Sequence, residues 1–440
     1  MGFHLGLILI VFSFPVFAQP IVSKSTPEIL DLKSSIQRAS NDNPRLLLAK
    51  KESMIAKEQL RQARSLFYPK VNLWMDYVRY RHETLGNTYP ELGNVVLEAP
   101  IPTRSTTRAN PLSENLYLGR VGFIQTLYAG GKLNTTYRLS KANIQRAESK
   151  FISTQRDVEF ETADAFYRLL AHAQMEKTLQ EGLLDLVRVV GYPNQGHKKF
   201  IMSGYRANFR QKLADIRQKK QNAKLDYLRA MGVELFSEIE VEGDFNRKPV
   251  IENLQTALVW AKQNRNELKE SLIQQEANQL SIQLSLSERY PTFLLGGGVE
   301  VRDKDLTLEE TNWNTALSMN IPIFDGFSSR ARIRESRHRA EQGRLQRVQL
   351  EDQVEMEVRT TFSQAAYWRN ETNVRRIELE DLETSRRSYL VSQHSKYSLD
   401  QRVDFLTWLI DARLSLISAQ LEHALAECRL SKSIGKSIGE

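Results

Sequence analysis

Four segments of the chain alternate apolar and polar residues at every second position. The clearest is 312–324, where Trp313, Leu317 and Met319 fall on one face and Asn314 and Ser318 on the other. A period of two is the signature of a β-strand with two different faces. We therefore expect strands at about 69–81, 115–128, 291–303 and 312–324.

Outside these strands the apolar spacing changes to three and four. In 46–67 the sequence predicts a coiled-coil seam, and a second seam near the C-terminus runs from Phe405 to Leu430 with His423 as its one polar member. The stretches 132–188 and 328–396 contain no proline. At ~1.5 Å per residue they predict helices of roughly 85 to 100 Å, which we expect to coil against partner helices.

The order of these elements occurs twice. A helical segment stops at Tyr68-Pro69 and again at Tyr290-Pro291, because proline cannot continue a helix. Each strand pair then closes on an aromatic residue and a glycine turn, at 128–131 and 324–326. A duplicated pattern constrains the whole fold. It predicts two interlocked helix-strand-strand-helix repeats, 19–240 and 241–440, within a mainly α-helical chain.

Residues 1–18 predict a cleaved signal peptide, because an apolar run ends in Val16-Phe17-Ala18. A transmembrane anchor is the competing interpretation, but the run is short for a bilayer span. Cys428 is the one cysteine, which excludes an intramolecular disulfide framework. The net charge of +8 is spread among many acids, so it indicates solvated helices rather than a nucleic-acid partner.

In an exported chain, strands with one apolar face predict either a soluble sheet with a covered side or a lipid-facing barrel wall with a wet lumen. Four strands cannot close a barrel, and an open edge cannot lie in hydrocarbon. A barrel would therefore need other copies of the chain. The first strand pair is joined by a long loop within 82–114, as expected of an outer-membrane barrel whose long loops face outside.

Signals of catalysis are weak throughout the sequence. Gly130-Gly131-Lys132 lacks the spacing of a phosphate loop, and the glycines at 296–298 lie inside an expected strand, where close backbone approach or a bulge is the simpler role. The histidines never pair at metal-ligand spacing, and His423 is more typical of a core residue. We expect no enzyme, no cofactor and no metal site.

Taken together, these motifs resemble the TolC family of bacterial outer-membrane efflux and secretion channels, from about Leu30 to Gly435. The resemblance lies in the order and duplication of short motifs: Asn43-Pro44-Arg45-Leu46, the two Tyr-Pro breaks, 125–131, 321–326, and the helix ends at 230–232 and 433–435.

The resemblance implies a homotrimer in which each chain gives four strands to a twelve-stranded β-barrel in the lipid bilayer. A coiled-coil α-helical barrel would continue it into the periplasm. The implied function is a passive exit duct of a tripartite efflux pump or a type I secretion system. Its partners would be a periplasmic adaptor and an inner-membrane transporter of RND, ABC or MFS type. The alternative is an exported periplasmic coiled-coil scaffold or adaptor without a membrane barrel.

The resemblance also implies a gate where the long helices turn back. Matching candidates for the channel entrance are Tyr397, Asp400, Arg402 and Asp404, and threefold repetition would make a carboxylate ring able to bind cations. A solvated turn with an aspartate helix cap is the alternative. Candidates for the adaptor-docking tip are Ser398, Leu399, Gly191, Tyr192 and Pro193. The first-half tip departs from the family because Lys198 and Lys199 replace the expected acid, so docking there is left open.

Overall fold

The computed structural model describes residues 28–79, 115–190, 196–245, 247–303, 311–390 and 398–438. The signal peptide expected at 1–18 and the long loop at 82–114 lie outside these ranges. The helices are α1 (Leu32–Asp42), α2 (Pro44–Ser65), α4 (Lys132–Val190), α5 (Gly196–Met231), α6 (Leu254–Asn264), α7 (Asn266–Ser287), α8 (Ser328–Leu390) and α9 (Leu399–Ser433). The strands are β1 (Glu28–Leu30), β2 (Lys70–Arg79), β3 (Asn115–Ala129), β4 (Ile239–Val241), β5 (Thr292–Asp303) and β6 (Thr311–Asn320).

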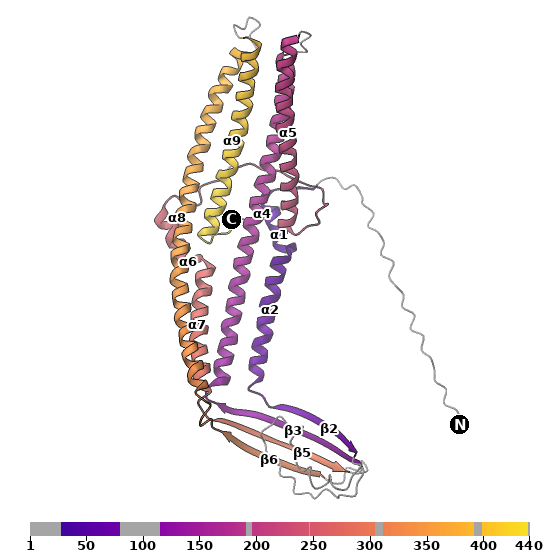
Figure 1. Ribbon diagram of the computed structural model, residues 1–440, viewed down its shortest axis with the longest axis vertical. Coiled ribbons are helices and arrows are strands. Elements are labelled where there is room, and N and C mark those ends of the chain that lie inside the picture. Colours follow the sequence, from indigo (N-terminus) through magenta and orange to yellow (C-terminus); the bar gives the residue numbers. More distant parts are fainter. Residues whose placement is uncertain are drawn as a thin grey trace, which may run out of the picture.

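Two rods run the length of the helical part and confirm the expected long helices. The helix α4 has 59 residues and α8 has 63, so each is roughly 90 Å long. Figure 1 shows α2 and α7 beside the half of each rod nearest the sheet, and α5 and α9 beside the half that ends at the tip. The chain thus forms one tall wall of helices standing on a four-stranded sheet.

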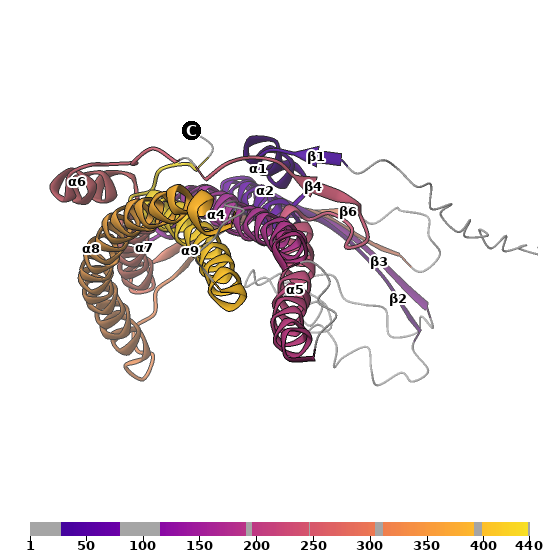
Figure 2. The ribbon, with the colours of Figure 1, turned by 90° about the horizontal axis from the view of Figure 1, so that it is seen from above.

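Seen along its long axis, this wall is curved. Figure 2 shows α1, α6, β1 and β4 on its convex side, at mid-height in Figure 1. The parallel pairing of β1 with β4 joins the start of the first repeat to the segment that follows its last helix, α5. We call these mid-height elements the belt, and the convex side the outer side of the wall.

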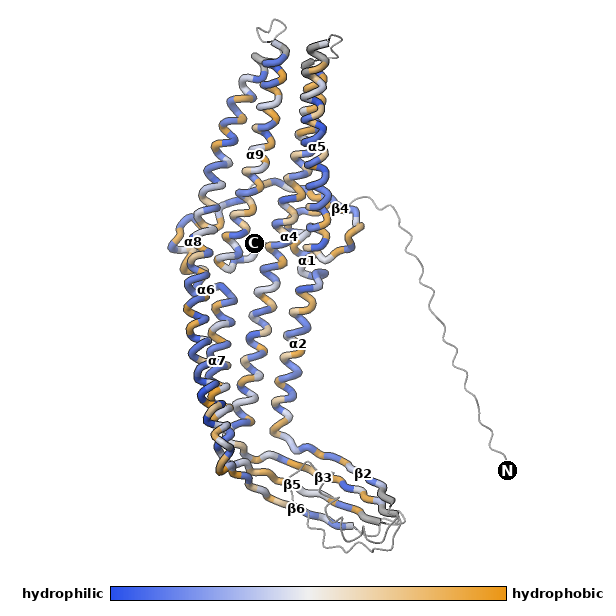
Figure 3. The backbone as a smooth tube through the Cα atoms, in the orientation of Figure 1, coloured by the Kyte–Doolittle hydropathy of each residue, from blue (hydrophilic) through white to orange (hydrophobic). Residues whose placement is uncertain are grey.

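The sheet has the order β2-β3-β5-β6, with all neighbours antiparallel, so the two repeats pair through β3 and β5. Its register aligns the apolar positions of all four strands into rows, one of which is Leu73, Val121, Val299 and Trp313. The opposite face carries rows such as Trp74, Arg120, Glu300 and Asn312. Figure 3 shows the resulting alternation of colour along each strand.

The strand boundaries differ from the sequence prediction mainly at the C-terminal end of β6. The last strand stops at Asn320 rather than at 324, and 321–325 have no regular structure. Pro322 has no N–H to give to a ladder, which accounts for the earlier stop. The glycines of β5 lie where backbones approach closely, since a Cβ on Gly298 would lie 2.6 Å from the carbonyl oxygen of Val121. The irregularity in register lies elsewhere, between Thr126 and Tyr128.

The two repeats lock their returning helices in the same way. Asn43, between α1 and α2, donates from Nδ2 to the carbonyl of Ala230 near the end of α5 at 2.7 Å. Arg265, between α6 and α7, donates from Nη1 to the carbonyl of Ser433 at the end of α9 at 3.0 Å. Asn43 and Arg265 directly follow the belt helices α1 and α6. In both places the side chain donates to a helix-terminal carbonyl that has no partner within its own helix.

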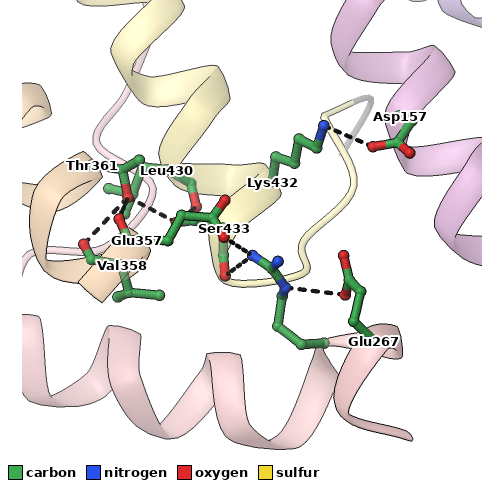
Figure 4. Close-up of polar contacts among 9 residues, drawn as sticks. Asp157, Glu267, Glu357, Val358, Thr361, Leu430, Lys432 and Ser433 are labelled. Carbon is green, nitrogen blue, oxygen red and sulfur yellow. Dashed lines mark hydrogen bonds and ion pairs between the residues drawn. The ribbon is translucent and has the colours of Figure 1, made fainter. Parts of the chain in front are cut away.

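A cluster of polar contacts strengthens the second of these locks. Thr361 of α8 lies 2.9 Å from the hydroxyl of Ser433, and Lys432 binds Asp157 of α4 at 2.7 Å (Figure 4). Arg265 also binds Glu357 of α8 at 2.9 Å. The end of α9 is thereby fixed to both long rods, so motion of the tip relative to the belt must come from the helices above it.

The predicted seams are confirmed in part. On α2 the buried positions are Leu46, Ala49, Ala56 and Ala63, whereas Phe67 remains 44% exposed. On α9 the predicted seam is too narrow. A second row, including Leu406, Ile410 and Leu425, is buried as well, because α9 packs against both α8 and α4. Apolar residues with a period of 3.5 predict the contact of a helix with one partner helix only, and α9 has two.

Candidate functional site

The described part of the tip comprises the ends of α4 and α8 and the starts of α5 and α9. Gly191, Tyr192, Pro193 and Tyr397 lie outside the described residues. Ser398, Asp400, Arg402 and Asp404 are described, and Leu399 is described in its backbone, as the first residue of α9.

Ser398 caps α9. Its hydroxyl accepts from the backbone N–H of Gln401 at 3.3 Å, and the Gln401 side chain accepts from the N–H of Ser398 at 2.9 Å. This reciprocal capping box satisfies two backbone donors that a helix start leaves without partners. The interpretation of an aspartate as the helix cap is therefore wrong. Asp400 instead lies exposed in the first turn, where the helix dipole favours a negative charge.

Asp404, one turn further along α9, accepts a hydrogen bond from the phenolic hydroxyl of Tyr205 on α5. This bond to the carboxylate, together with burial and the charges of Asp404 and Asp400, raises the pKa of Tyr205 to about 12. The phenol therefore stays protonated and can donate at any physiological pH. The bond joins two hairpins of one chain, since α5 returns from α4 and α9 from α8.

A second polar link follows at the next heptad. Lys212 of α5 donates to Asp411 of α9 at 2.7 Å. Both donors precede their acceptors by 199 residues, so α5 and α9 run parallel in a constant register. Arg386 of α8 adds a third link to Asp185 of α4 at 3.1 Å. Arg402 is only partly exposed, and its Nε has no hydrogen-bond partner among the described residues.

An apolar cluster lies between the hairpins at the level of these links. It contains Leu179, Leu186, Met202, Phe209, Leu213, Val403, Leu406 and Ile410, contributed by α4, α5 and α9. Gly182 of α4 permits the close approach, because a Cβ there would lie 2.4 Å from the Cδ1 atom of Ile410. The contact is closely packed, so the hairpins can separate only by exposing apolar surface.

This arrangement can act as a latch. The hydrogen bond and the two ion pairs form at part-buried or exposed positions, where each contributes modestly. Of the predicted gate residues that the structure describes, only Asp404 takes part in it, and sequence reasoning missed Tyr205, Lys212 and Asp411. Their matched spacing of seven residues is visible in the sequence, but nothing there indicates that α5 and α9 are neighbours.

The sheet provides the second functional feature, an apolar face without cover from the described chain. Along one row Leu73 is 64% exposed and Trp313 is 79% exposed. Leu317, two rows further along the same face and opposite Leu295, is 66% exposed. Large apolar side chains gathered on one exposed face indicate contact with lipid or with another macromolecule.

Among the helices that the structure describes, none combines the length and the apolar character that a bilayer span requires. Likewise, the described residues include no cluster of three His, Cys, Asp or Glu side chains that could hold a metal ion.

Comparison with known families gives one match, to the outer membrane efflux protein family over residues 35–195. That segment spans α1, α2, β2, β3 and α4, which is most of the first repeat. No curated protein matches the chain.

Several solved structures share the fold over nearly the whole chain. The open state of the MtrE outer membrane channel of Neisseria gonorrhoeae matches with a TM-score of 0.76 and 14% identity, covering 92% of this chain and 89% of that one. VceC, an outer membrane protein of Vibrio cholerae, matches with 0.74 and 13%, covering 92% and 96%. The CmeC outer membrane channel of Campylobacter jejuni matches with 0.72 and 14%, covering 92% and 85%.

Proposed function

Because the chain belongs to the outer membrane efflux protein family, we propose that it forms a three-chain exit duct whose inner end is closed by the contact between Tyr205 and Asp404. The chain is an outer-membrane efflux channel that extends into the periplasm, and it is a transport protein rather than an enzyme.

The edges of the sheet support self-association. The edge strands β2 and β6 each pair with one neighbouring strand, and the strands alternate in direction across the sheet. Strand β6 of one copy would therefore meet β2 of the next in an antiparallel pair. Closing the ring removes both edges, which hydrocarbon does not tolerate. Three copies give a twelve-stranded barrel, in keeping with the trimeric channels that the family implies, with the exposed apolar rows facing lipid.

The proposed partners are a periplasmic adaptor and an inner-membrane transporter. Rods of roughly 90 Å carry the tip far from the sheet, and a channel in the outer membrane has no energy source of its own. The described residues contain no catalytic constellation that would supply one. Energy for export would then come from the transporter, with the adaptor bridging it to the tip.

The gate assignment rests on one observation, the hydrogen bond that joins α5 to α9 near the tip. Breaking it would leave Lys212–Asp411 and the apolar cluster to hold the hairpins. Asp404 is engaged in this bond, so the exposed Asp400 is the better candidate for a cation-binding carboxylate ring in the trimer. Three copies of Asp400 around one axis would attract divalent cations at the entrance.

Single-channel recording in planar bilayers tests the proposal. We expect Tyr205→Phe and Asp404→Asn each to raise conductance, and the double variant to add little to either, because both remove the same bond. Asp400→Asn should weaken block by divalent cations while leaving the basal conductance nearer to wild type. Unchanged conductance in both latch variants would exclude the gate. A soluble monomer in cell fractions would exclude the duct itself.

A further inference from the structure

The loop that leaves the sheet toward α8 carries an unusual strain. Phe327 has a φ of +66°, a left-handed conformation that costs a non-glycine residue roughly 1 to 2 kcal/mol. The equivalent position in the first repeat is Gly131, with a φ of +84°. Phe327 is 58% exposed, and its ring packs edge-on against Phe324, which is 75% exposed. Two exposed aromatic side chains thus lie at a turn where glycine would relax the backbone.

Three arginines continue from this aromatic pair along one face of α8. Arg330, Arg334 and Arg337 are spaced by four and three residues, so they share that face. All three are exposed, and none has a carboxylate partner among the described residues. Arg330 lies 5.4 Å from the centre of the Phe327 ring. The alternate face is different, because Arg332 and Arg339 pair with Glu288 and Glu335.

The unpaired arginines lie toward the outer side of the wall. Arg337 and Phe362 are 25 residues apart, which is about seven helical turns, so both point in nearly the same direction. Phe362 packs on the apolar cluster that contains the belt helix α6, and α6 lies on the convex side in Figure 2. Arg330 is a further seven residues before Arg337, which keeps it on this side.

Basic side chains lie at the start of both long helices that leave the sheet. The first turn of α8 contains Arg330 and no acid, and the carboxylate of Asp325, just before the helix, accepts from the backbone N–H of Ser329 at 2.7 Å. The start of α4 repeats the arrangement with Lys132, Arg138 and Lys141, and its first acid is Glu148. Both helices begin directly above the sheet in the view of Figure 1. Basic side chains are thus concentrated at the two helix starts nearest the sheet.

We propose that Phe324, Phe327, Arg330, Arg334 and Arg337 form a binding site for the phosphate headgroups of anionic phospholipids in the periplasmic leaflet of the outer membrane. The proposal rests on the barrel placement above. The surface continues directly from the apolar face of β6, so the aromatic rings would lie at the interface and the arginines at headgroup depth. Guanidinium groups suit phosphate oxygens, and basic side chains beside a membrane attract anionic lipid.

The test uses the purified trimer in dodecyl maltoside, titrated with dioctanoyl phosphatidylglycerol, and follows binding and melting temperature. We expect saturable, salt-sensitive binding to wild type. In the triple variant Arg330→Gln, Arg334→Gln, Arg337→Gln the affinity should fall about a hundredfold. Replacing the three arginines with lysine should preserve most of the binding. Dioctanoyl phosphatidylcholine should bind weakly to every variant.

Arg210, Lys219 and Lys224 on α5 provide a matched control, because changing them to Gln removes the same charge far from the sheet. Equal loss of affinity in this control would overturn the site in favour of a general charge effect. Unchanged affinity in the arginine variant, or equal binding of inorganic phosphate, would also overturn it. Dissociation of that variant to monomers without lipid would assign the arginines to a contact between copies. Fractionation of the wild type beforehand tests the outer-membrane placement separately.

Discussion

Tyr205 of α5 donates its phenolic hydrogen bond to Asp404 of α9, and seven residues further along both helices Lys212 binds Asp411. Two polar contacts in one register hold a parallel helix pair that belongs to different hairpins. The pair is one of the contacts between the two repeats near the tip, beside the ion pair of Arg386 with Asp185, and it lies above the belt that fixes the other end of α9.

The pKa of Tyr205 gives a direct measure of this contact. Asp404→Asn should lower it from about 12 toward the ordinary value near 10, because the hydrogen bond to the carboxylate is the largest cause of the shift. The stabilisation that this hydrogen bond provides is fully present below pH 10, the ordinary tyrosine pKa that applies to the unfolded chain. It is lost as the pH rises through the higher pKa of Tyr205 in the folded chain. Nuclear magnetic resonance of ring-labelled tyrosine can follow the titration. Tyr167 and Tyr227 also titrate near 12, but chiefly because of burial, so their pKa values should not move.

Two equivalent glycines should differ sharply on mutation. Gly130 and Gly326 both have a left-handed backbone, with φ of +59° and +64°. A Cβ on Gly130 would lie 2.5 Å from the carbonyl oxygen of Ser287, whereas one on Gly326 would meet nothing within 4 Å. We expect Gly326→Ala to cost roughly 1 to 2 kcal/mol of strain and Gly130→Ala about 1 to 3 kcal/mol more. Guanidinium unfolding followed by circular dichroism measures both, and equal costs would contradict the crowding argument.

The two faces of β6 should respond oppositely to a charge. Leu317→Arg on the exposed apolar face should block membrane insertion, since an arginine near the middle of a bilayer costs about 2 to 4 kcal/mol in each copy. Ser318→Arg, one residue away on the other face, should be tolerated in a wet lumen. Outer-membrane fractionation and heat-modifiable gel mobility compare the two. If Leu317→Arg inserted normally, the periplasmic scaffold would become the better hypothesis.

The buried carboxylate of Glu427 predicts a pH-dependent defect. Burial opposes its ionisation, but the nearby His423 ring together with hydrogen bonds from Arg369 and the backbone N–H of Val250 outweighs burial and lowers the pKa. Arg369 donates at 2.7 Å, while His423 lies at 3.6 Å. Arg369→Gln should therefore cost about 2 to 3 kcal/mol at neutral pH, less than for a fully buried pair because Arg369 is 37% exposed.

The sign of the pH dependence distinguishes this mechanism from simple loss of packing. In the wild type the stabilisation is present above the ordinary glutamate pKa near 4.5 and is lost as pH falls through the lower folded value. In Arg369→Gln, protonation of Glu427 should remove a buried negative charge that has lost its arginine partner. The difference in unfolding free energy between the wild type and this variant should therefore shrink from pH 6 to pH 4. Arg376→Gln removes an exposed arginine with only a 3.4 Å contact to Asn373 and is the matched control. A constant difference across this range would contradict the assignment.

Local patterns in the sequence were sufficient to predict the helices and strands and their order along the chain. Tyr68-Pro69 and Tyr290-Pro291 end helices because proline removes a backbone donor and clashes with the preceding turn, and both breaks separate helices from strands in the structure. The alternation in β6 predicted its two faces, since successive side chains on a strand point to opposite sides. The sequence also predicted the two long rods, because 132–188 and 328–396 contain no proline.

Only the tertiary structure decided which helices are neighbours. The parallel contact of α5 with α9 joins residues 199 positions apart, and no local pattern encodes such a distance. The second buried row of α9 also depends on long-range packing. A helix that lies between two partner helices buries two stripes of side chains, whereas the apolar seam in the sequence predicts one. The sequence by itself thus determined the elements and their order through backbone geometry and periodicity. Long-range packing determined the latch, the belt and the unpaired arginines of α8, because these depend on which surfaces the assembled chain leaves in contact or exposed.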